Sequence, residues 1–131
     1  MHRNYNPSQI APPFSRYSHA VEASSAERWL HISGQVGVTP EGAMREGAAA
    51  QIRQALENLL AVLAAARMSV DDLVKITAIL ARHEDVGTYR EIREEVFGRA
   101  APASTLIVAG LANPEWLFEV EAVAARPDSR I

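Results

Sequence analysis

The last apolar run of the chain, residues 116–124 (Trp-Leu-Phe-Glu-Val-Glu-Ala-Val-Ala), carries two glutamates, Glu119 and Glu121. Successive side chains of a strand point to opposite faces, so this alternation predicts a strand with both carboxylates on one face and Phe118 and Val120 on the other. An ionised carboxylate on a half-buried sheet is costly unless a partner or water reaches it. The run therefore indicates either a solvated sheet face or a wet cleft beside this strand.

Hydrophobic periodicity along the whole chain predicts five strands and two helices in the order β-β-α-β-α-β-β. We expect strands over residues 17–23, 28–35, 73–81, 106–109 and 116–124, and helices over residues 45–67 and 83–97. The first two strands are interpreted as a hairpin, and Gly98 is the expected stop of the second helix. The predicted class is α+β, a single mixed β-sheet with two helices on one face. Residues 1–131 are expected to form one domain, with an extended arm over 1–15 and a tail over 126–131.

Apolar residues fall on both faces of several predicted strands, among them Ile32, Ile76, Ile79 and Ile107. Helices on one side of a sheet cover only one of these faces. Burial of the second face against other copies of the chain is the simplest outcome. The pattern therefore predicts a homo-oligomer.

Composition limits the classes of function. The chain has 131 residues, a net charge of −3 and no cysteine, so it lacks thiolate nucleophiles and cysteine-based metal sites. Its four histidines show no metal-binding spacing, and no nucleotide-binding glycine motif is present. We expect no metal and no cofactor. The acidic balance argues against nucleic acid, and the lack of a long apolar segment argues against a membrane partner. A cytoplasmic location is the default expectation.

The second predicted helix is densely charged. Arg90 and Arg93 alternate with three glutamates, Glu91, Glu94 and Glu95. A solvated, charged helix face is the interpretation favoured for all five residues.

Six short blocks, taken together, resemble one known family. They are Tyr17-Ser18-His19-Ala20-Val21, Ile32-Ser33-Gly34-Gln35, Gln54-Ala55-Leu56-Glu57-Asn58, Asp72-Leu73-Val74-Lys75-Ile76-Thr77, Pro102-Ala103-Ser104-Thr105 and Glu119-Val120-Glu121-Ala122-Val123-Ala124. Their order and spacing resemble the RidA/YjgF family of enamine/imine deaminases, also labelled the endoribonuclease L-PSP family. The resemblance covers residues 17–125.

The resemblance implies a chorismate-mutase-like fold and a homotrimer with a central barrel and a cleft between each pair of subunits. It further implies hydrolysis of reactive 2-imino or 2-enamino acids to 2-oxo acids and ammonia. Glu119 matches the family's water-orienting glutamate. The implied substrate-binding positions are Tyr17, Ser33, Gly34, Arg90, Ser104 and Thr105.

Ser104 departs from the family pattern. Deaminating members carry an arginine at this position of the Pro-Ala-x-Ser/Thr motif, where it grips the substrate carboxylate. A serine hydroxyl offers one neutral hydrogen bond in place of a bidentate, charge-assisted pair. The resemblance therefore implies a non-standard substrate, unless Arg90 or Arg16 replaces the missing guanidinium.

Three functions stay open at this point. The first is a deaminase-type hydrolase of an imine or enamine. The second is a trimer that binds a small molecule without catalysis, which the loss of the arginine favours. The third is an endoribonuclease, which the acidic composition argues against.

Overall fold

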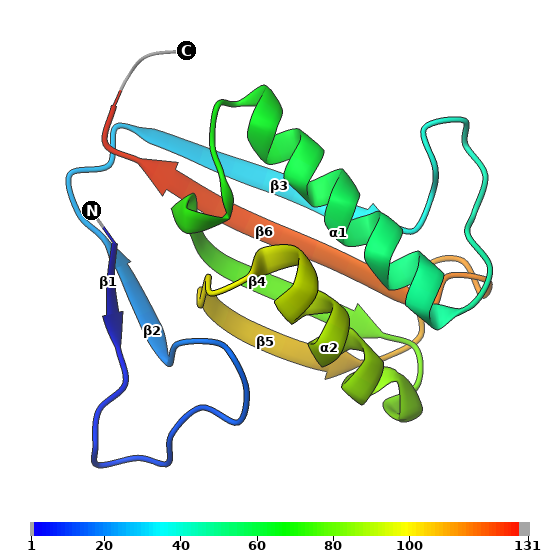
Figure 1. Cartoon of the computed structure of the whole chain (residues 1–131), viewed down its shortest axis with the longest axis horizontal. Helices are drawn as coiled ribbons and strands as arrows, with labels where there is room; N and C mark the ends of the chain where they lie inside the picture. Colours follow the sequence, from blue (N-terminus) through cyan, green and yellow to red (C-terminus); the bar gives the residue numbers. More distant parts are fainter. Residues whose placement is uncertain (1, 129–131) are drawn as a thin grey trace.

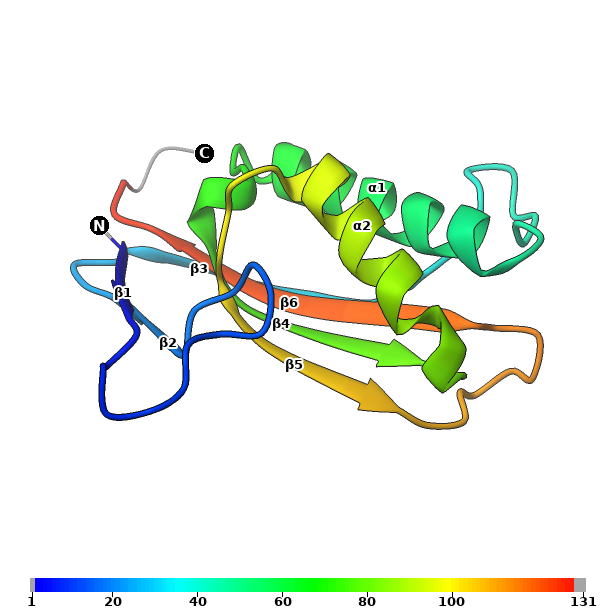
Figure 2. The same cartoon turned by 60° about the horizontal axis from the view of Figure 1, so that its bottom comes forward.

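The computed structural model describes residues 2–128, in which two helices cover one face of a mixed sheet (Figures 1 and 2). The elements are β1 (His2–Tyr5), β2 (Ala20–Ala23), β3 (Arg28–Val36), α1 (Ala48–Ala65), η1 (Val70–Asp72), β4 (Leu73–Leu80), η2 (His83–Asp85), α2 (Val86–Phe97), β5 (Ala103–Val108) and β6 (Phe118–Arg126). The predicted α+β class is confirmed. Within the described range, no helix is long and apolar enough to cross a membrane.

The four-stranded sheet has the order β3-β6-β4-β5. Strand β6 pairs antiparallel with both β3 and β4, while β4 and β5 are parallel and joined by α2. A parallel pair needs a long crossover, which α2 provides here. Strand β5 begins at Ala103, three residues before its predicted start, so Ser104 lies within a strand.

The predicted hairpin between the first two strands is wrong. Strand β2 pairs with β1 in a separate two-stranded sheet, and β3 pairs with β6. The arm predicted over residues 1–15 therefore contributes a strand, and the fold has two sheets in place of one. Pairing partners far apart in sequence are decided by packing of the whole fold, which local alternation does not encode.

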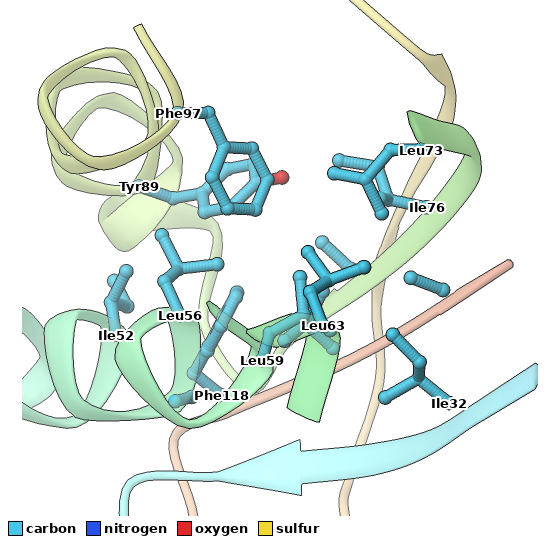
Figure 3. Close-up of a cluster of buried hydrophobic side chains, with 14 of the residues drawn as sticks. Ile32, Ile52, Leu56, Leu59, Leu63, Leu73, Ile76, Tyr89, Phe97 and Phe118 are labelled. Carbon is cyan, nitrogen blue, oxygen red and sulfur yellow. The ribbon is translucent and has the colours of Figure 1, made fainter. Parts of the chain in front are cut away.

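The core lies between the helices and the four-stranded sheet (Figure 3). Alternation along β6 buries Phe118, Val120, Ala122 and Ala124 on the helix side, as predicted. Helix α1 presents a stripe of buried residues at three- and four-residue spacing, namely Ile52, Leu56, Leu59 and Leu63. Helix α2 ends at Phe97 and is capped by Gly98, the predicted stop, whose positive φ suits glycine.

The opposite face of the sheet presents the strand residues that alternate with the buried ones. Glu119, Glu121 and Val123 of β6 lie there with Thr77 and Ile79 of β4. Two large apolar side chains on the flanking strands are strongly exposed, Trp29 at 53% and Ile107 at 41%. Neither helix covers this face, which we name the open face (Figure 2).

Candidate functional site

A bulge in β3 places Gly34 against the carboxylate of Glu119. Ile32 lies opposite Ala122 and Gln35 opposite Val120, so Ser33 and Gly34 together face a single residue of β6. A Cβ added to Gly34 would overlap the Glu119 carboxylate, since it would lie 2.8 Å from Cδ of that side chain. Glycine is therefore what allows this carboxylate to lie against the backbone of the bulge.

The Glu119 carboxylate is half-buried and unpaired. Across residues 2–128 it makes no hydrogen bond and no ion pair. Its oxygen atoms are free to accept hydrogen bonds from a water or a ligand. Ser33, Gly34 and Glu119 thus form one cluster on the open face.

A second cluster lies around a small cavity at the β5 edge, on the helix side of the sheet. The cavity has a volume of about 150 Å³. Its lining residues come from the N-terminal segment, α2 and β5, and are Phe14, Ser15, Tyr17, Tyr89, Arg90, Arg93, Ser104 and Leu106. It brings together three of the predicted binding residues, Tyr17, Arg90 and Ser104. We call it the α2–β5 pocket.

Thr105, another predicted binding residue, and Arg16, a possible substitute for the missing guanidinium, also lie outside this pocket. Thr105 follows Ser104 in β5 and points to the open face, where its hydroxyl accepts a hydrogen bond of 2.7 Å from the Lys75 ammonium. Arg16 is exposed and pairs with Glu94 at 3.4 Å, with a further hydrogen bond to the Gly98 carbonyl. Its guanidinium is engaged along α2 and is not part of the pocket lining.

Arg93 is the residue that the sequence interpretation missed. The charge pattern of α2 predicts a solvated face for Arg93, but the side chain is only 4% exposed and lines the α2–β5 pocket. A signal was present in the sequence, because Arg93 lies four residues after Tyr89 and four before Phe97 and so falls on the apolar stripe of α2.

Burial changes the proton affinity of two pocket residues. It lowers the pKa of Arg93 from its ordinary value, and the neighbouring Tyr89 and Glu94 only partly oppose this effect. It also raises the pKa of Tyr89 above its ordinary value, while the charges of Arg93 and Arg90 act in the opposite direction. In the part of the chain that is described, no group of three or more metal-ligating side chains is present.

The two clusters lie on opposite faces of the sheet. Ser104 pairs with Ile76 of β4 and Glu119 pairs with Ile79. Positions three residues apart on one strand point to opposite faces, which is consistent with Ile76 being fully buried under the helices and Ile79 lying on the open face. One protomer therefore cannot bring its Glu119 carboxylate into its own α2–β5 pocket.

The fold and these clusters define a small α+β protein with an unpaired carboxylate on an open sheet face and a cationic pocket at the sheet edge. The family model described as Endoribonuclease L-PSP matches residues 8–126. The chain belongs to this family, the RidA/YjgF family.

Relatives in sequence and structure agree with this assignment. The chain is 34% identical over 114 residues to a RutC family protein of Pyrococcus horikoshii, covering 86% of this chain and 88% of that one. It is 34% identical over 122 residues to the 2-iminobutanoate/2-iminopropanoate deaminase of Mus musculus, covering 92% and 85% of the two chains. The crystal structure of YyfB from Yersinia pestis, a conserved Rid family protein of unknown function, superimposes with a TM-score of 0.84 at 33% identity, covering 95% and 98%.

Proposed function

We propose that this chain forms a homotrimer whose inter-subunit clefts hydrolyse a reactive imine or enamine. The separation of the two clusters carries this proposal. Since Glu119 and the α2–β5 pocket lie on opposite faces of one sheet, a complete site needs the Glu119 of one subunit and the pocket of another. The reaction class is supported by relatives that are named as imine deaminases, among them the protein of Mus musculus.

The open face supports assembly with other copies of the chain. It combines the exposed Trp29 and Ile107 with the half-buried Ile79 and Val123. Removing such apolar area from water favours association by about 25 cal/mol per Å². Glu119 and Gly34 lie on this face, so association through it would place them at a subunit boundary.

The reaction needs little activation by the protein, because the carbon of a C=N bond is already electrophilic. Glu119 orients a water and takes one of its protons as the water oxygen bonds to that carbon. That proton is delivered to the nitrogen, which gives a carbinolamine, a carbon that bears one hydroxyl and one amino group. The hydroxyl proton is then transferred to the amino group through the same carboxylate, the C–N bond breaks, and ammonia leaves as the carbonyl forms. Water and imine are thus converted into a carbonyl compound and ammonia, with no change of oxidation state.

The remaining cluster residues hold the ligand. Gly34 lets the ligand approach the backbone of the bulge, and Ser33 offers a hydroxyl beside it. Tyr17, Arg90 and Ser104 provide polar groups from the pocket side. Thr105 contributes from the open face.

A mixed-subunit experiment tests this proposal. Imines are generated in situ and ammonia release is followed for the wild type, which is expected to exceed the rate in buffer. Glu119→Gln removes the carboxylate and Ser104→Phe fills the pocket, so the rate of each variant alone is expected to fall by about 10²-fold or more. In trimers assembled from equal amounts of both, about a quarter of the clefts should contain two intact halves and regain activity. Sites built within single chains would give no recovery, and this result would contradict the proposal.

The Gly34→Ala variant is expected to lower the hydrolysis rate by about 10²-fold with little change in melting temperature. The added methyl group would displace the Glu119 carboxylate, and misplacing a catalytic group by about 1 Å costs about that factor. Gly34 is exposed and its φ is accessible to alanine, so the fold has no reason to change. Steady-state rates and thermal unfolding of the two proteins check both parts. An unchanged rate would contradict the proposed catalytic role of the contact between Gly34 and the Glu119 carboxylate.

A second candidate is a trimer that binds a small molecule without turnover. Ser104, in place of the arginine of deaminating members, favours it. Ligand binding that raises the melting temperature with no ammonia release from any imine would establish it.

A further inference from the structure

Three buried hydrogen-bond donors of α2 have no acceptor. They are the Tyr89 hydroxyl and the Nε and Nη2 groups of Arg93. The hydroxyl and the guanidinium are close enough for each to shift the pKa of the other, but among residues 2–128 none of the three donors has a partner at hydrogen-bond geometry. Both side chains line the α2–β5 pocket. We propose that this pocket binds the carboxylate of a small organic acid through Arg93, a guanidinium supplied by the helix where deaminating relatives use one from the strand.

The charge of the pocket selects an anion. Its lining includes two guanidinium groups, those of Arg90 and Arg93, and no acidic side chain. No carboxylate of the described chain lies within ion-pair distance of Arg93. A buried charge is costly unless it is paired, and a bound anion supplies the missing partner.

The shape of the pocket favours a carboxylate on a short chain. The planar guanidinium can donate two parallel hydrogen bonds to a carboxylate, and the Tyr89 hydroxyl can donate a third. A volume of about 150 Å³ holds a molecule of only a few heavy atoms. Phe14 and Leu106 supply apolar walls for an alkyl group.

This inference rests on the proposed function and specifies its substrate class. Ser104 lines the same pocket as Arg93, so the small serine leaves space that the guanidinium of α2 can use. With serine at position 104, the positive charge of the pocket comes from α2 in place of β5, and the ligand is still an anion. The substrate is an anionic imino acid, in place of the non-standard substrate implied by the serine alone.

Binding of propanoate and of the isosteric, neutral propanamide tests the pocket directly by titration calorimetry. The wild type is expected to bind propanoate and to show no measurable affinity for propanamide. Arg93→Met keeps most of the side-chain volume and removes the charge, and it should weaken propanoate binding about a hundredfold or more. Arg99→Met, which removes an exposed arginine outside this pocket, should leave the affinity unchanged.

Thermal unfolding separates a binding role from a structural one. Without ligand, Arg93→Met should melt at the same temperature as the wild type or higher. It removes a buried charge that has no ion-pair partner among residues 2–128 and only a cation–π contact of 6.0 Å with the Phe97 ring. Propanoate should raise the melting temperature of the wild type only. A large drop for the variant without ligand would show that Arg93 holds the fold together, and it would overturn the inference. A crystal structure of the wild type with propanoate should show the carboxylate in contact with the Arg93 guanidinium.

Three outcomes separate this inference from the proposed function. Propanoate binding that depends on Arg93, with no ammonia release from any imine, would leave the carboxylate site standing and reject the hydrolase. Hydrolysis of imines by a wild type that does not bind propanoate would reject the carboxylate site alone. Dissociation of the oligomer by Arg93→Met, with no propanoate binding by the wild type, would assign the pocket to a carboxylate of a neighbouring subunit and overturn the inference.

Discussion

Replacing Glu119 by glutamine is expected to slow imine hydrolysis by about 10²- to 10⁴-fold, the usual contribution of a positioned general acid or base. Glutamine keeps the shape of the side chain and its place against Gly34, but its amide cannot take a proton from water. Substrate affinity should change little, because the proposed ligand contacts of the α2–β5 pocket are untouched. The loss should therefore appear in kcat and not in KM.

Glu121→Gln is the matched control for this prediction. Glu121 lies two residues away on the same strand and the same face, but it is exposed. Its amide variant should keep the wild-type rate within about threefold, as expected for a surface substitution with a small energetic effect. Equal losses in both variants would mean that the charge of the open face matters and that Glu119 has no special role.

The Phe118→Ala variant is expected to lower the free energy of unfolding by about 3–5 kcal/mol, the range for removing a fully buried aromatic ring. Phe118 has no exposed surface, and its ring lies 5.3 Å from that of Tyr89, centroid to centroid. The substitution leaves a cavity between β6 and α2. Urea unfolding of wild type and variant at equal protein concentration measures the difference, since an oligomer's stability depends on concentration.

Ile107→Ala is the control for Phe118→Ala. Ile107 lies on the open face of β5 and is substantially exposed in the protomer. A loss below about 1 kcal/mol is expected there if the chains are monomeric during the measurement. A larger loss at Ile107 that disappears on dilution would locate a subunit contact at this strand.

Local pattern was sufficient for most of the elements. Alternation assigned Phe118 and Glu119 to opposite faces of β6, and both helices were found from three- and four-residue spacing. These properties follow from side-chain period alone, which each segment carries in its own residues. The pairing of β2 could not be found this way, because β1 and β3 are both compatible with its alternation.

The candidate site also combines features that the local sequence pattern predicts with features that depend on the tertiary structure. The sequence by itself determined that Glu119 shares a face with Glu121, because strand geometry allows no other arrangement of alternate residues. Only the tertiary structure decided that Glu119 lies against Gly34, that Arg93 is buried with no ion-pair partner among residues 2–128, and that the two clusters occupy opposite faces of the sheet. Each of these depends on the register between segments far apart in the chain, and register is decided by how the whole core packs.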